Sequence, residues 1–343
     1  MTTVDYGGWL INELSLAVSD LVNPSKRVSI LYFASALFFA FVLFLFRYGK
    51  GAPRRLSALF SWRLWWHPSA RVDYALWLGN RLILSLLFPK VITTLGVVTW
   101  LMFQLREVGL SALAMTIPDW SVIALFSSCY FLLDDFSRFW LHWLMHRWSW
   151  LWAFHRVHHS AKVLTPFTVL RTHPVEGMLF YGRSLLVQGS LVALFVTLFP
   201  GQVSLLMIGG VFVATYVFNI FGANLRHSPV PISYGKTLER WLISPAQHQL
   251  HHSAAVEHYD CNFGVVLAVW DRWFRCLQFG SDQQKLRYGT LSTLDQAGVF
   301  GQYLSPILFL GRGLNGRQAG LIKTTLVNAG KAKARETTQA KPE

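Results

Sequence analysis

Long apolar stretches alternate with polar loops along the first two thirds of the chain. The clearest stretch is residues 28–46, a run of 19 residues without a charged side chain. As a helix it would be about 28 Å long, close to the thickness of the hydrocarbon layer of a bilayer. Because the run is apolar on every face, a helix in the core of a soluble protein is a poor alternative. It is predicted to cross a membrane.

Four further apolar segments extend this pattern. We expect membrane segments at residues 82–105, 120–133, 184–199 and 203–221. A proline and a lysine interrupt the first of these, although a spanning helix can accommodate proline. The second ends at Asp134 and Asp135, which indicates an exit into an aqueous or catalytic zone. Pro200 and Gly201 separate the last two segments and predict the tight turn of a hairpin that dips through the membrane.

Positive charge is distributed unequally between the loops. Between the first two segments, Asp73 is the only acid among seven basic residues, Arg47, Lys50, Arg54, Arg55, Arg63, Arg71 and Arg81. The loop of residues 106–119 carries a single basic residue. The positive-inside rule therefore predicts that the first loop is cytoplasmic. With five crossings, residues 136–183 and everything after Asn224 fall on the same side.

The composition supports a membrane protein. The 343 residues are 53% hydrophobic and only 14% charged, with 15 Trp and 26 Phe, whereas soluble domains are about a quarter charged. The net charge of +14 matches basic cytoplasmic loops, and no basic stripe on a soluble module points to nucleic acid. The cysteines Cys129, Cys261 and Cys276 have no CxxC spacing and predict neither disulfides nor a zinc ribbon. No signal peptide is evident.

Histidines carry the chemistry. Eleven of the twelve follow residue 141, and eight of these fall into three clusters with helical spacing: His142 and His146; His155, His158 and His159; His248, His251 and His252. Residues three or four apart share one face of a helix, and imidazole is a ligand for iron, zinc, copper and nickel. Desolvated histidines near a membrane are costly without a partner. We therefore expect these eight side chains to enclose one or two metal ions.

The histidine motifs resemble the sterol desaturase and fatty acid hydroxylase family of membrane di-iron oxygenases. The motifs that carry the resemblance are DDFSRFWLHWLMHR, WAFHRVHHS, RTHPVE, LRHS, SPAQHQLHHS and DCNFGVVLAVWDRWF. The sequence departs from the family at one turn, because members usually follow WDRxF with Gly-Thr whereas this chain has Arg275 and Cys276 after Phe274.

The resemblance implies roles for individual residues. The eight clustered histidines would be metal ligands, and His227 in LRHS matches an isolated ligand between the second and third boxes. His173, Glu176, Asn224, His258 and Asp260 are candidates to support the ligands, since outer carboxylates and amides often orient imidazoles. His67, in the tryptophan-rich WRLWWHP stretch, is expected to be interfacial.

These observations predict an all-α fold. We expect a multi-pass bundle of about five membrane segments with a cytoplasmic, histidine-rich helical cap that holds two metals. Residues 1–120 would form the N-terminal membrane region, residues 121–280 the catalytic domain with its helical hairpin, and residues 281–343 a cytoplasmic tail. The tail is polar and rich in Lys and Ala from about residue 331, and is predicted to be disordered there.

The resemblance implies a lipid hydroxylase or desaturase that uses two iron ions and O2. The lipid (a sterol, a fatty acyl chain or a related lipid) would enter from the bilayer. Electrons would come from a small donor protein with its reductase, because no haem-attachment, GxGxxG or ferredoxin motif is present. The absence of a terminal dilysine signal and the short length favour a bacterial inner membrane over the endoplasmic reticulum.

Three other functions remain open on the residues alone. A zinc hydrolase would normally show an HExxH motif, which this sequence lacks. A bis-histidine haem carrier would place its histidines within the apolar runs. A lipid-binding or transport protein could keep the helices but has no reason to keep eight clustered histidines.

Overall fold

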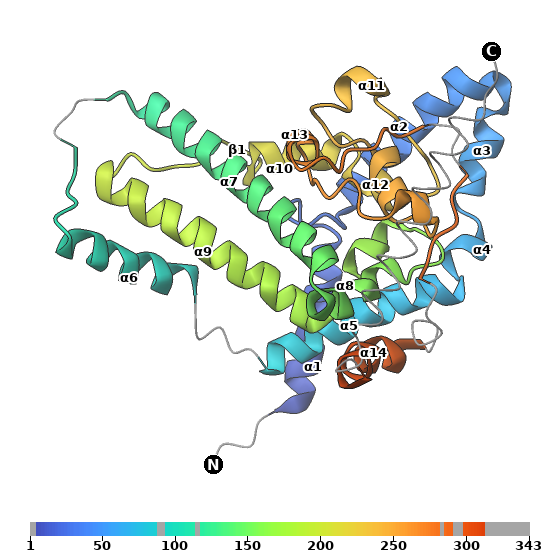
Figure 1. Ribbon diagram of the computed structural model, residues 1–343, viewed down its shortest axis with the longest axis horizontal. Helices are drawn as coiled ribbons and strands as arrows, with labels where there is room; N and C mark the ends of the chain where they lie inside the picture. Colours follow the sequence, from blue (N-terminus) through green and yellow to red (C-terminus); the bar gives the residue numbers. More distant parts are fainter. Residues whose placement is uncertain (1–4, 88–92, 114–116, 282–284, 291–297, 313–343) are drawn as a thin grey trace. The chain divides into compact units, whose positions relative to one another are not determined.

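The computed structural model describes residues 5–87, 93–113, 117–281, 285–290 and 298–312 (Figure 1). Within these residues the chain is helical apart from one two-stranded hairpin, so the predicted all-α class is confirmed. The N-terminal helices are α1 (Tyr6–Asp20), α2 (Ile30–Tyr48), η1 (Gly49–Gly51), α3 (Ala52–Ala58), α4 (Trp62–Trp65), α5 (Pro68–Leu87) and α6 (Thr94–Glu107). The middle of the chain forms α7 (Asp119–Arg147), α8 (Ser149–His159), η2 (Pro166–Leu170), α9 (Pro174–Leu198), β1 (Met207–Ile208), β2 (Val211–Phe212) and α10 (Val213–Ile220). The remaining elements are η3 (Ala223–His227), α11 (Gly235–Leu238), α12 (Pro245–His251), η4 (Val256–His258), α13 (Val269–Trp273) and α14 (Gly298–Arg312).

The chain divides into two compact units, each made of three segments. The first comprises Met1–Phe39, Leu78–Leu141 and Pro174–Asn224, and the second comprises Ala40–Trp77, His142–His173 and Leu225–Glu343. All nine histidines predicted as ligands lie in the second unit. The predicted division at residues 120 and 280 follows the order of the sequence, whereas these units are interleaved along it.

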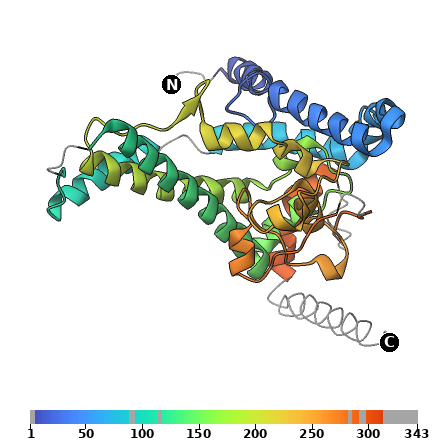
Figure 2. The same ribbon diagram turned by 90° about the horizontal axis from the view of Figure 1, so that it is seen from above.

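Helices α6, α7 and α9 form the body of the first unit and run side by side in both views (Figures 1 and 2). Val122 and Phe126 of α7 pack against Phe195 of α9 in a buried apolar cluster. At Gly189 of α9, a Cβ atom would lie 2.8 Å from Val97 Cγ1 of α6. Glycine therefore permits the close approach of these two helices.

Two helical stretches among the described residues are long and apolar enough to cross a membrane. They are Ile30–Ala58 and Pro174–Leu198, and only 17% and 28% of their apolar windows are buried. The predicted segments 28–46 and 184–199 lie in these two stretches except for residues 28, 29 and 199. The helix α9 ends at Leu198, and Gly201 has a positive φ of 82°, which matches the turn predicted at Pro200 and Gly201.

The fifth predicted segment, residues 203–221, is not a spanning helix. Met207–Ile208 and Val211–Phe212 pair as antiparallel strands, joined by Gly209 and Gly210 with φ of 55° and 78°. Two consecutive residues with positive φ make the tight hairpin turn that suits glycine. The helix α10 that follows has only 8 residues, or about 12 Å, too short to cross a bilayer.

Two other predicted segments also differ from the structure. Residues 82–105 are divided between α5, which ends at Leu87, and α6, which begins at Thr94; the interrupting Pro89 and Lys90 lie outside the described residues. The segment 120–133 does not end at its acids, because α7 continues to Arg147. Asp134 is accommodated there by ion pairs with Arg138 at 2.7 Å and Arg183 at 2.9 Å.

In the second unit, helix α14 packs against α8, which carries three of the histidines. Arg156 of α8 donates to the Ser305 carbonyl at 3.0 Å, and Ser160 Oγ donates to Gln302 Oε1 at 3.0 Å. Part of the region predicted as a tail is therefore a packed helix. The predicted disorder from residue 331 lies outside the described residues.

Candidate metal centre

The nine predicted ligands come from four elements, and all nine residues belong to the second unit. Helix α7 supplies two of them near its C-terminal end, α8 supplies three, and the 3-10 helix η3 supplies one. Helix α12 and the residue that caps it supply the last three. All nine side chains are buried: His142, His146, His155, His158, His159, His227, His248, His251 and His252.

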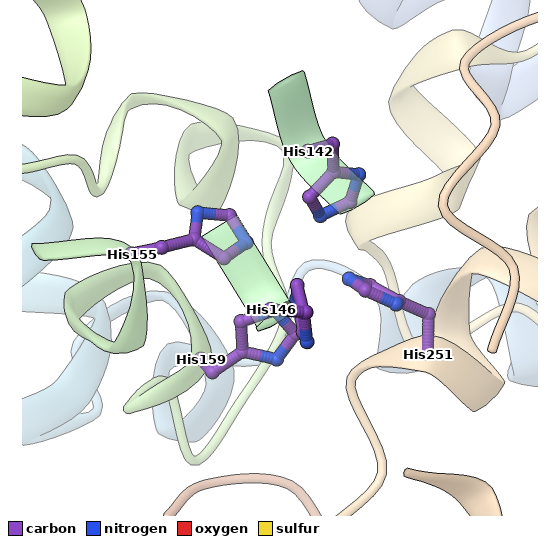
Figure 3. A group of neighbouring side chains, drawn as sticks. All are labelled: His142, His146, His155, His159 and His251. Atoms are coloured by element: carbon purple, nitrogen blue, oxygen red, sulfur yellow. Dashed lines mark hydrogen bonds between the residues drawn. The ribbon is translucent and has the colours of Figure 1, made fainter. Parts of the chain in front are cut away.

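These histidines form two separate groups, each able to hold a metal ion. In each group, one ring nitrogen per residue lies within 4.8 Å of every other. The first group is His142, His146, His155, His159 and His251, whose rings turn toward a common centre (Figure 3). The second group is His158, His227, His248 and His252.

Each HxxHH motif is shared between the two groups. His159 lies in the first group and its neighbour His158 in the second; likewise, His251 lies in the first group and His252 in the second. The two groups adjoin, because the rings of His159 and His252 stack with their centroids 4.7 Å apart. A pair of adjacent histidines at the end of a helix thus links the two groups.

The distances within the second group fit a cation better than hydrogen bonds alone. His227 Nε2 lies 3.3 Å from His158 Nε2, 3.1 Å from His252 Nε2 and 3.0 Å from His248 Nε2. A ring nitrogen carries at most one hydrogen, so these three contacts cannot all be good hydrogen bonds from His227. A metal ion at this point would accept all four nitrogen lone pairs.

Backbone carbonyls orient three of the rings. His142 Nδ1 donates to the Phe263 carbonyl at 2.9 Å, and His251 Nδ1 donates to the Cys261 carbonyl at 2.7 Å. His158 Nδ1 donates to the Arg171 carbonyl at 3.2 Å. Because a carbonyl only accepts, these contacts place the proton of a neutral ring on Nδ1. The lone pair on Nε2 is then directed into the site, as a metal ligand requires.

Burial keeps the rings uncharged. Desolvation lowers the pKa of His142, His159 and His248 well below its usual value. It does the same for His251 and His252. Neutral imidazoles are the form that binds metals, and a set of imidazoles without thiolates suits iron, zinc, copper or nickel. The residues present therefore fit two metal ions.

The predicted supporting residues lie in different surroundings. Asp260 Oδ1 lies 3.6 Å from His146 Nδ1, where it can orient that ring. His173 Nε2 contacts the Tyr303 carbonyl at 3.3 Å, and His258 Nδ1 contacts Ser253 Oγ at 2.9 Å, so neither ring joins a metal group.

Two further candidates belong to the first unit. Glu176 is buried in the first turn of α9. Asn224 Nδ2 donates to the Arg27 carbonyl at 3.0 Å.

His67, which was predicted to be interfacial, accepts a hydrogen bond at Nδ1 from the Ser69 amide at 3.1 Å, at the start of α5.

Four buried charged residues around the site were not predicted. Arg171 contributes the carbonyl that orients His158, and its guanidinium pairs with Asp73 at 2.9 Å. Arg226 and Asp271 contact the loop of residues 263–265. Three of the four lie inside the quoted motifs RTHPVE, LRHS and WDRWF, which was the signal available. Asp73 lies outside these motifs, and the sequence distinguished it only as the one acid among seven basic residues.

Comparisons with known proteins agree with this site. The fatty acid hydroxylase family model matches residues 127–276. A Delta(7)-sterol 5(6)-desaturase of Gibberella zeae is 33% identical over 50% of this chain and 48% of its own length. Alkylglycerol monooxygenase of Homo sapiens is 27% identical over 68% of this chain and 47% of its own length. That of Danio rerio is 28% identical over 46% of this chain and 31% of its own length.

The predicted resemblance is thereby confirmed, since residues 127–276 match the fatty acid hydroxylase family model and the relatives include a sterol desaturase. The matched region contains all nine clustered histidines. The chain spans about half the length, or less, of these three relatives. No solved structure matches it.

Proposed function

We propose that this protein is a membrane-bound di-iron oxygenase that hydroxylates or desaturates a lipid. The observation that carries the proposal is the arrangement of nine buried histidines in two adjoining groups with converging nitrogens. A single structural or catalytic zinc needs only three or four ligands. Two groups of five and four histidines fit a pair of metals.

The chain's own residues prepare the site for this chemistry. When bound, a pair of irons supplies the oxidising power needed to attack an unactivated C–H bond with O2, a reaction that side chains alone cannot perform. The carbonyls of Cys261, Phe263 and Arg171 hold three rings in the required tautomer. Burial of the whole cluster excludes water, which protects a reactive site from side reactions.

The names of the relatives support a lipid substrate. Two kinds of relative, a sterol desaturase and an alkylglycerol monooxygenase, are named for reactions on lipids. The two helices able to cross a membrane support an enzyme embedded in the bilayer, into which such a substrate dissolves. We propose that the lipid enters from the bilayer and that a small protein with its reductase delivers the electrons.

We further propose that the site faces the cytoplasm, in a bacterial inner membrane. The basic residues from Arg47 to Arg71 and the clustered histidines belong to one compact unit. The acid that follows in the sequence, Asp73, is buried and paired with Arg171. Asp73 therefore does not neutralise the basic residues from Arg47 to Arg71. By the positive-inside rule, their charge supports a cytoplasmic position for this unit.

Lys50 is exposed, so labelling of the variant Lys50→Cys in sealed cells tests this orientation. Protection from an impermeant reagent is expected. Ala52 is fully buried and would be a misleading position for the same experiment. Labelling of Lys50→Cys from outside would contradict the cytoplasmic placement.

Metal analysis and lipid analysis together test the function. We expect about two irons per chain, and a cellular lipid that gains one oxygen atom or loses two hydrogen atoms only when the gene is present. A single zinc would indicate a hydrolase, and a haem absorption band an electron carrier. Absence of bound metal would indicate a lipid-binding or transport protein. Each of these three results would overturn the proposal.

A further inference from the structure

Asp271 is a fully buried carboxylate on the short helix α13 (Val269–Trp273). Its oxygens contact three donors. The backbone N–H of Phe263 donates to Oδ1 at 2.6 Å, and that of Gly264 donates to Oδ2 at 2.8 Å. The Cys276 thiol contacts Oδ1 at 3.2 Å. Burial raises the pKa of Asp271 to about 7, whereas these three donors favour its ionised form.

The loop that meets Asp271 is shaped to bring its backbone close to this carboxylate. Asp260 and Asn262 both adopt positive φ, 59° and 54°. At Gly264, a Cβ atom would lie 2.6 Å from Asp271 Oδ2, 2.6 Å from the Leu267 carbonyl and 2.9 Å from Ile243 Cγ1. Only glycine permits this approach, so the contact between Gly264 and Asp271 is a built feature of the loop.

The same peptide group also contacts a predicted metal ligand. The N–H of Gly264 and the carbonyl of Phe263 belong to one planar amide, in which electron density is shared between nitrogen and oxygen. Its N–H points to Asp271 Oδ2 at 2.8 Å, and its oxygen accepts from His142 Nδ1 at 2.9 Å. Asp271, one peptide group and His142 thus form a continuous chain of hydrogen bonds.

Through such a chain of hydrogen bonds, the negative charge of Asp271 polarises the contact to His142. A negative carboxylate at the N–H end draws the amide proton and makes the carbonyl at the other end a stronger acceptor, because hydrogen bonds in series polarise one another. A stronger acceptor at Nδ1 makes Nε2 a better metal ligand. Carboxylates that hold a ligand histidine directly have the same effect, and their loss weakens metal binding about 10–100-fold.

We propose that Asp271 is a positioning residue that strengthens His142 as a metal ligand through the Phe263–Gly264 peptide group. The inference rests on the proposed function, since it presumes a metal at the first histidine group. It assigns a task to a carboxylate that touches none of the histidines. It also gives a reason for the geometry of the DCNFG loop, which offers an N–H to Asp271 and a carbonyl to His142 at once.

A purely structural role for Asp271 makes a different prediction. In that case its removal would loosen the loop and lower stability, and any folded molecules would bind metal with an unchanged ligand field. A second buried carboxylate provides the matched control. Glu239 accepts from the backbone N–H of Gly280 at 2.8 Å and from Ser244 Oγ at 2.7 Å, and both donors lie outside the loop of residues 260–264 that contacts His142.

The test uses Co(II) as a probe, because its visible absorption reports the ligands and its affinity can be measured against a chelator. Purified full-length protein is compared with Asp271→Asn and Glu239→Gln, both of which remove a buried charge at nearly constant shape. We expect Asp271→Asn to weaken Co(II) binding about 10–100-fold and to shift the absorption bands. We expect Glu239→Gln to leave both unchanged, whatever it does to the melting temperature.

A second variant serves if Asp271→Asn does not fold. Cys276→Ala keeps the carboxylate and removes one of its three donors, so more of its charge acts on the two N–H groups. The absorption bands should then shift in the direction opposite to that of a weakened ligand. Unchanged bands in the folded variants, or equal weakening in Asp271→Asn and Glu239→Gln, would overturn the inference. Failure of the unmodified protein to bind Co(II) would instead overturn the proposed metal site.

Discussion

Arg226 donates a hydrogen bond from Nη2 to Nδ1 of His248 over 3.1 Å. A guanidinium group can only donate, so Nδ1 of His248 accepts, and the proton of the neutral ring sits on Nε2. His142, His158 and His251 are held in the opposite tautomer by carbonyls. His248 is therefore the one of these four whose ring must change its proton position before Nε2 can bind a metal.

Replacement of Arg226 by glutamine should have two opposite effects. Stability should fall by about 2–4 kcal/mol, because the carbonyls of Gly264 and Val265 both lose a buried donor. Affinity for Co(II) should rise several-fold, because about 1 kcal/mol of charge repulsion is removed and the amide oxygen can accept from Nδ1–H. Thermal unfolding and chelator competition measure the two effects. Weaker Co(II) binding by the folded variant would contradict this account of His248.

Single histidine variants should separate the two groups. His251→Ala removes a nitrogen from the first group, and His227→Ala or His252→Ala removes one from the second. We expect each variant to lose iron and activity, with the loss confined mainly to one of two metals. His227 contacts three partners of its group, so His227→Ala should act like loss of a box histidine. Iron content and turnover are measured on the same preparation, and normal values for both would exclude a role for His227.

The buried pair of Asp73 and Arg171 should contribute strongly to stability. Arg171 also donates to the carbonyls of Val157 and Ser69, and its own carbonyl orients His158. Asp73→Asn leaves a buried guanidinium without its counter-charge, which costs about 3–5 kcal/mol. The pair of exposed Lys26 and partly buried Asp20, at 4.0 Å, is the control: Lys26→Gln should change stability by less than about 1 kcal/mol. Equal melting temperatures for the two variants would contradict this assignment.

Arg275 should tolerate, and benefit from, replacement by glycine. It is exposed and adopts φ of 55°, a left-handed conformation that favours glycine. The resemblance noted in the sequence implies glycine at this position, and the φ of Arg275 is one that glycine adopts without strain. Arg275→Gly should stabilise the protein by about 1 kcal/mol, seen as a higher melting temperature.

Asn262 is the matched control for this prediction, since its φ of 54° is nearly the same. Its side chain donates to the Gln247 carbonyl at 3.0 Å and accepts from the Gln278 amide at 2.8 Å. Asn262→Gly should therefore destabilise the protein despite the favourable backbone. If both variants shifted the melting temperature in the same direction, backbone strain at Arg275 would not be the cause.

The predicted membrane segments show what hydropathy alone can predict and what it misses. Residues 28–46 were predicted well, because no charged residue, glycine or proline interrupts the run. Residues 203–221 have a similar apolar content but contain Gly209 and Gly210, whose positive φ turns the chain back as a hairpin. Mean hydropathy over a window of residues reflects the apolar side chains. It carries no information on the backbone conformation that two glycines permit.

The sequence by itself determined which residues form the candidate metal centre and which face of each helix they share. Helical spacing at i, i+3 and i+4 is a local property, and so the clusters on α7, α8 and α12 follow from it directly. Only the tertiary structure decided how these faces combine: that His158 and His159 belong to different groups, that Asp73 supports His158 through Arg171, and that Asp271 reaches His142 through a peptide group. The last two relationships run through the backbone carbonyls of Arg171 and Phe263. Because every residue possesses a backbone carbonyl, residue identity leaves no pattern that could have predicted them.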